Sequence, residues 1–131
     1  MKLKEFNSAN SRKKVAPLTP SMGINFKVGS MHFNKSAVEL LGLKHGHQVK
    51  IFMDLEDCEN WYVEVVGDGG FSLYSGSASP ASRFNAAAVA REIKEATGFD
   101  GAYGSVLLAG KPTMRGKRIL FGLIVSRLKT A

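Results

Sequence analysis

The apolar residues of this chain occur in short runs, most of which alternate with polar residues. The longest apolar run, residues 119–125, has seven residues, whereas a helix that spans a membrane needs about 20. Alternation over so few residues is typical of half-buried β-strands. The pattern predicts strands at residues 24–28, 31–33, 49–53, 61–66, 71–74, 105–109 and 118–128.

A short helix is predicted directly after the second of these strands. Ser36 and Glu39 have the spacing of a capping box, in which both side chains bind free amides at the helix start. Asn34 is an alternative cap, since a helix boundary is uncertain by a residue or two. Gly42 is suited to the end of this helix.

A second helix is predicted over residues 85–97, which are rich in alanine. Asn85 is placed to cap its start and Gly98 to end it. Two helices among short strands with mostly hairpin connections indicate an α+β fold, with small, mostly antiparallel sheets or a barrel.

The positive charge lies at the two ends of the chain. The 131 residues carry a net charge of +7, and 44% of them are hydrophobic, which is typical of a globular domain. Residues 1–14 hold five Lys or Arg and one acid, residues 36–75 hold two Lys and seven acids, and residues 101–131 hold six Lys or Arg and no acid. A polyanion is therefore expected to contact the ends and to avoid the acidic residues between 54 and 68.

The sequence contains no enzyme motif. Residues 110–118 resemble a phosphate-binding loop, but the spacing of the two glycines is wrong and Arg118 stands where Ser or Thr belongs. His45 and His47 lack the second ligand pair of a zinc site. The one cysteine, Cys58, cannot form an internal disulfide. We therefore expect a cytoplasmic protein that is not an enzyme and has no cofactor, metal or membrane segment.

Residues 24–66 carry a pattern of strand, short helix and strand with glycines at both reversals. The residues that carry it are Gly29, Met31, Phe33, Lys35, Val38, Leu41, Gly42, Leu43, Gly46 and Val49. The pattern resembles the AbrB/MazE-type swapped-hairpin DNA-binding family, although Asn34 stands where that family usually has Pro and His47 where it usually has Asp. The resemblance implies a double-split β-barrel, a homodimer that interleaves its hairpins, and DNA contacts through Lys27, His32 and Lys35.

Two further basic elements are independent of that resemblance. The first is a Gly-flanked loop at the tip of the predicted C-terminal hairpin, with Lys111, Arg115, Lys117 and Arg118. A cationic two-stranded ribbon has a shape that fits a DNA groove. The second is the N-terminal run Arg12, Lys13 and Lys14, which resembles the basic arms that follow a nucleic-acid backbone. The alternative is that both elements are solvated and only keep the protein soluble.

Aromatic side chains provide a weaker indication of single-strand binding, because bases stack on exposed rings. Alternation along the strands places most of the aromatic residues in the core. The candidates are Phe26, Phe33, Trp61, Tyr62 and Phe71.

These observations predict three segments and one function. The segments are a basic arm at residues 1–20, a ββαββ unit at residues 21–75, and a helix with a β-hairpin at residues 76–131 that packs on it. The expected function is that of a homodimeric DNA-binding protein: a transcriptional regulator, antitoxin-like or architectural. The alternative is a structural or interaction protein of a phage or mobile element that binds no nucleic acid.

Overall fold

The computed structural model describes residues 2–3, 19–57, 59–76 and 79–130. Arg12, Lys13 and Lys14, most of the expected N-terminal arm, and Cys58 lie outside the described residues. The two helices are α1 (Lys35–Leu41) and α2 (Ala87–Thr97). The strands are β1 (Ser21–Asn25), β2 (Ser30–Phe33), β3 (Gln48–Met53), β4 (Asn60–Val66), β5 (Phe71–Ser72), β6 (Arg83–Asn85), β7 (Tyr103–Leu108), β8 (Thr113–Arg115) and β9 (Arg118–Thr130).

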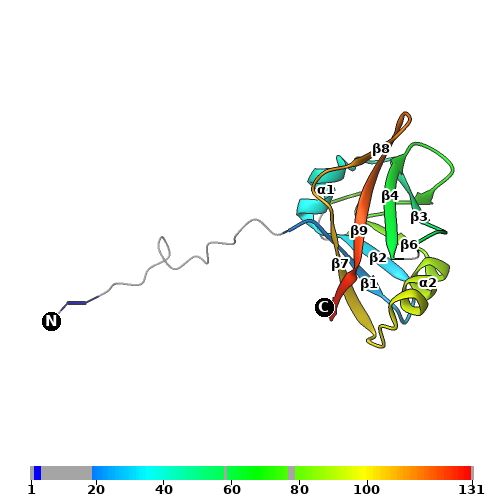
Figure 1. The fold of residues 1–131 in the computed structure, drawn as a ribbon. Coiled ribbons are helices and arrows are strands. Elements are labelled where there is room, and N and C mark those ends of the chain that lie inside the picture. Colours follow the sequence, from blue (N-terminus) through cyan, green and yellow to red (C-terminus); the bar gives the residue numbers. More distant parts are fainter. Residues whose placement is uncertain (1, 4–18, 58, 77–78, 131) are drawn as a thin grey trace.

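Eight strands form a nearly closed, barrel-like antiparallel sheet in the order β5-β3-β4-β9-β7-β1-β2-β6, and β8 extends it by pairing with β9 (Figure 1). The two outer strands approach each other, because Tyr74, just after β5, bridges to Arg83 in β6. The predicted α+β class with an antiparallel sheet is confirmed. The C-terminal strands β7 and β9 lie between β1 and β4, so residues 21–75 and 76–131 build one sheet together.

The interior of the sheet is apolar and is covered at one end by α2. Phe84 of β6 stacks on Phe33 of β2, with ring centroids 5.6 Å apart, and on Phe71 of β5 at 5.7 Å. Helix α2 buries Ala90 and Ile93 against the same core. These contacts join the β2–β6 edge of the sheet to the β5 edge across the interior. Among the described residues, no helix is long and apolar enough to span a membrane.

Helix α1 is capped by Asn34, the alternative that the sequence left open, and not by Ser36. The Asn34 Oδ1 accepts hydrogen bonds from the Ala37 N–H at 2.8 Å and from the Ser21 N–H at 3.1 Å. Its Nδ2 donates to the Thr19 carbonyl at 2.9 Å. Asn34 therefore binds the helix start to the beginning of β1, which a proline at this position has no side-chain groups to do. Gly42, with φ of 65°, ends the helix as predicted.

The start of α2 was predicted wrongly. Asn85 belongs to β6, and α2 begins after Ala86 with no side-chain cap. The side chain of Asn85 instead accepts a hydrogen bond from the Tyr74 hydroxyl at 3.1 Å. Gly98 ends the helix as expected, with φ of 69°.

The first strand also lies earlier than predicted, at Ser21–Asn25 instead of residues 24–28. The Asn25 side chain accepts from the Lys27 N–H at 3.0 Å and from the Val28 N–H at 3.4 Å, so it forms a turn where the alternation predicts more strand. Gly29 completes this turn with φ of 75°. Lys27 consequently lies in a turn and not on a sheet face.

Substitution of the α1 cap tests these hydrogen bonds. Asn34→Ala is expected to lower the free energy of unfolding by about 1–2 kcal/mol, because the Ala37 and Ser21 amides lose their acceptor. Asn34→Asp keeps the acceptor oxygen, so its free energy of unfolding should fall by less. Urea denaturation followed by circular dichroism measures both variants. Equal losses in the two variants would contradict the role assigned to the Oδ1 atom.

Candidate nucleic-acid interface

The β8–β9 hairpin extends beyond the end of the barrel that lies away from α2 (Figure 1). Its turn is shorter than the sequence indicated, because Thr113–Arg115 is itself a strand and Gly116 turns the chain with φ of 63°. Lys117 therefore lies at the tip. Lys111 precedes β8, and three strand residues separate it from the tip by about 10 Å. Lys111, Arg115 and Lys117 are all exposed.

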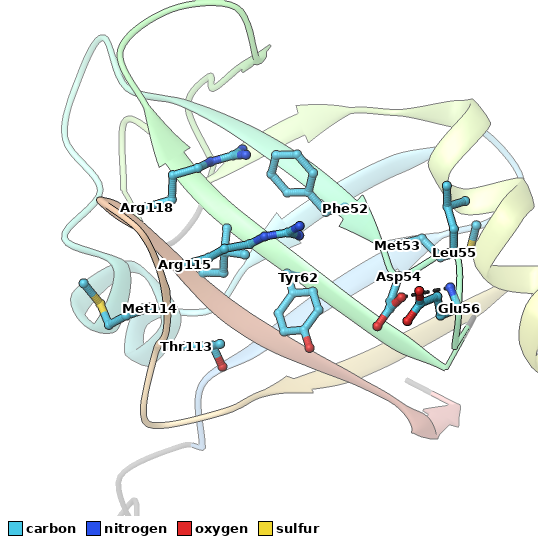
Figure 2. Close-up of a pocket in the computed structure, with 11 residues that line it drawn as sticks. Phe52, Met53, Asp54, Leu55, Glu56, Tyr62, Thr113, Met114, Arg115 and Arg118 are labelled. Carbon is cyan, nitrogen blue, oxygen red and sulfur yellow. Dashed lines mark hydrogen bonds between the residues drawn. The ribbon is translucent and has the colours of Figure 1, made fainter.

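The two faces of this hairpin have different chemistry, because successive strand residues point to opposite faces. Met114 and Ile119 are paired on one face and are 61% and 47% exposed. On the other face Arg115 is paired with Arg118, and Thr113 with Leu120. That second face lines a groove of about 540 Å³. Met114 also borders the groove, although its side chain extends away from the other lining residues (Figure 2).

The floor of the groove is aromatic. Phe52 of β3 and Tyr62 of β4 lie opposite each other in the sheet, and both line the groove. Tyr62 was among the aromatic residues predicted from the sequence to stack on bases, whereas Phe52 was not. The alternation along residues 49–53 is the signal that could have found it, because it places Phe52 on the same face as Lys50, opposite the core residue Val49.

Arg118 is held in place by Glu64 of β4. Its guanidinium donates two hydrogen bonds to the carboxylate, at 2.9 and 3.0 Å, and lies 4.7 Å from the centroid of the Phe52 ring. The Arg118 hydrogen bond lowers the pKa of Glu64, although burial opposes this shift. The same bond raises the pKa of Arg118. Arg118 was predicted as a phosphate contact, but much of its charge is compensated by Glu64.

Acidic side chains line the opposite side of the groove. Asp54 and Glu56 follow β3, and the Glu56 N–H donates to the Asp54 Oδ1 at 2.9 Å. Their carboxylates face Arg115 across Tyr62 (Figure 2). The sequence predicts that a polyanion avoids the acidic residues between 54 and 68, and two of these residues, Asp54 and Glu56, line the groove beside the basic hairpin. A strand of phosphates cannot run the full length of this groove without meeting them.

The three residues expected from the family resemblance lie on separate elements, and none of them lines the groove. Lys27 is in the β1–β2 turn, 5.7 Å from the centroid of the Tyr103 ring. Lys35 is the exposed first residue of α1. His32 lies on β2 opposite Gly23 and Arg83. Burial, and then the charge of Arg83, lower the pKa of His32, which disfavours its cationic form at neutral pH.

Most of the other aromatic candidates belong to the core or to packed clusters. Phe33 and Trp61 are buried. Phe26 packs on Phe99 with ring centroids 5.3 Å apart, and Phe71 packs on Phe84. Within the part of the chain that the structure describes, no group of three or more His, Cys, Asp or Glu side chains is placed to hold a metal ion.

Comparison of the chain with protein-family models, with curated proteins and with solved structures gave no significant match. The resemblance of residues 24–66 to a swapped-hairpin family thus stays a prediction.

The ion pair beneath the groove has a pH dependence that can be measured. Arg118→Leu is expected to destabilise the protein most near neutral pH, because it leaves the buried Glu64 carboxylate without its partner. The lowered pKa of Glu64 means that the pair stabilises the fold above the ordinary pKa of a glutamate. This contribution is lost as the pH falls through the lowered value.

Urea denaturation at about pH 7 and about pH 3 checks this expectation. The difference between the wild type and Arg118→Leu should shrink at the lower pH. The matched control is Lys117→Leu, which removes an exposed cation of the same hairpin that does not line the groove and should show no such dependence. A difference that is the same at both pH values would contradict the account.

Proposed function

We propose that this chain is a non-enzymatic nucleic-acid-binding protein whose phosphate contacts are Lys111, Arg115 and Lys117. One observation carries the proposal: these three exposed cations follow one another along β8 and its two ends, in a segment, residues 101–131, that contains no acid. Among the described residues, no ion pair compensates any of the three. When unpaired cations of a protein bind phosphates, they displace the counterions that surround the nucleic acid, and the release of these counterions favours binding.

The shape of the hairpin supports the same proposal. A two-stranded ribbon that extends from a sheet can enter a groove of duplex DNA or lie along a phosphate backbone. The β8–β9 hairpin extends from the barrel on the side away from α2 (Figure 1). The run Arg12, Lys13 and Lys14 is a further phosphate contact in this proposal, on the basis of its charge in the sequence.

The family resemblance adds a homodimer to the proposal, in which residues 24–66 form a swapped-hairpin unit and Lys27, His32 and Lys35 contact DNA. Within the single chain, however, β1 and β4 already have β7 and β9 as neighbours. The barrel is thus nearly closed without strands from a second copy. Light scattering after size exclusion separates a dimer from a monomer of 14.2 kDa, and a monomer would remove the interleaved dimer while leaving the hairpin contacts in place.

A second candidate is a structural or interaction protein that binds no nucleic acid, such as a component of a phage or mobile element. The observation that favours it is the exposed apolar pair Met114 and Ile119 on the outer face of the hairpin. A protein partner would cover this face and leave the cations at its rim.

A salt titration distinguishes the two candidates. Fluorescence anisotropy with a random DNA duplex should show binding at low salt that weakens as salt is added. Lys111→Gln combined with Lys117→Gln removes two phosphate contacts, so the slope of log affinity against log salt should become shallower by about 1.8 on duplex DNA.

The matched control is Arg91→Gln combined with Lys94→Gln on α2, which removes the same charge from exposed positions away from the hairpin (Figure 1). It should leave the slope nearly unchanged. Absence of binding at low salt would refute the proposal, and so would an equal effect of the two double variants.

A further inference from the structure

We propose that the groove beside the β8–β9 hairpin takes one unstacked base of a single-stranded nucleic acid, and that Asp54 and Glu56 select a base with an exocyclic amino group. This inference rests on the proposed function and names its preferred substrate class. It starts from the charge distribution in the groove, in which Arg115 and two carboxylates face each other across an aromatic floor (Figure 2).

The floor offers a surface on which a base can stack. The Arg118 guanidinium lies over Phe52 and is fixed by the two hydrogen bonds that it donates to Glu64, while its side chain remains 47% exposed. Tyr62 lies beside Phe52 in the sheet and lines the same groove. Bases stack on both aromatic rings and guanidinium planes. Because Arg118 is already fixed, stacking a base on it costs little further ordering of the side chain.

The acidic side of the groove determines which part of a nucleic acid fits there. Asp54 and Glu56 repel phosphates, but their oxygens accept hydrogen bonds from the amino groups of bases, as carboxylates do from cytosine. Arg115 lies across Tyr62 from them and attracts a phosphate. A nucleotide can place its phosphate at Arg115 and the edge of its base at the two carboxylates. In this position it interacts favourably with both the basic and the acidic side of the groove.

The size of the groove fits one nucleotide and not a duplex. Its volume of about 540 Å³ lies within the range of about 300–1,000 Å³ of small-ligand sites. A paired base must be unstacked and unpaired before it can enter such a site, and this costs free energy. A single strand avoids this cost. A free mononucleotide can make the same contacts in the groove, but it lacks the further phosphates that would contact Lys111 and Lys117.

The stacking surface is tested with Tyr62→Leu. Anisotropy with an oligodeoxycytidine of about 12 nucleotides should show about tenfold weaker binding, whereas binding of a duplex should change little. Tyr103→Leu is the control, because Tyr103 is an exposed tyrosine beside Lys27 that does not line the groove. A larger loss in the Tyr103 variant would place the interface at the β1–β2 turn and overturn the inference.

The base selection is tested with the acids. The wild type should bind oligodeoxycytidine more tightly than oligothymidine, and Asp54→Ala combined with Glu56→Ala should abolish that ratio. Asp57→Ala combined with Glu59→Ala is a close control, since Asp57 Oδ1 accepts from the Glu59 N–H at 3.1 Å in the same local arrangement outside the groove. The proposed base selection is contradicted if the ratio of the two affinities is unchanged in the Asp54 and Glu56 variant, or if it falls equally in both double variants.

A readout on the unaltered chain removes any dependence on how the variants fold. Ultraviolet cross-linking of oligodeoxycytidine that carries 5-iodocytosine should attach the base at Phe52 or Tyr62, and competition with cytidine monophosphate separates a strand from a free nucleotide. Cross-links that map only outside the groove overturn the inference.

The two proposals fail in different ways. One outcome is that Lys111→Gln combined with Lys117→Gln weakens the binding of both the duplex and the single strand while Tyr62→Leu changes the binding of neither. In that case the hairpin contacts are correct and the base site is wrong. If neither substrate binds at low salt, both proposals are wrong.

Discussion

The long strand β9 is the element on which the rest of the structure depends. It pairs with β8 at its start, with β4 through residues 121–124 and with β7 through its second half. This one strand therefore holds the hairpin, the acidic β3–β4 side and the β7–β1 side in a single sheet. Its first residue, Arg118, reaches Glu64 and Phe52 only because the pairing of β9 with β4 fixes the register between them.

That register also explains why opposite charges meet in the groove. Sequence segments of opposite charge, residues 36–75 and 101–131, become neighbours when β9 lies beside β4. One acid of the middle segment, Glu64, is then used to hold Arg118, and two more, Asp54 and Glu56, line the groove across from Arg115. Within the described part of the hairpin, Lys111, Arg115 and Lys117 are then the exposed cations that no ion pair compensates. The overall charge of +7 describes none of this arrangement.

Local patterns in the sequence predicted the local structure well. Alternation located most strands, and Gly42 and Gly98 ended the two helices as expected, because these features depend on neighbouring residues alone. The same patterns missed β6, since three residues with one buried Phe84 are too few to show a period. They also assigned Asn85 to a cap, because nothing near it in the sequence shows that Tyr74 binds its side chain.

Most of the candidate site could not be predicted from such local patterns. Lys117 at a hairpin tip could be predicted from its glycine neighbour, but the contact between Arg118 and Glu64 spans 54 residues of sequence and depends on the strand order. No periodic signal reports which strands are neighbours. For the same reason the groove, with Phe52 and Tyr62 beneath the hairpin, could be found only once β9 was placed between β4 and β7.

The most direct test of the account is a map of amide chemical shifts in the ¹⁵N-labelled chain as a single-stranded oligodeoxycytidine is added. We expect shifts along residues 111–120, in residues 52–56 and at Tyr62, with α2 unaffected. Shifts confined to α2 or to the β1–β2 turn, or no shifts at low salt, would contradict it.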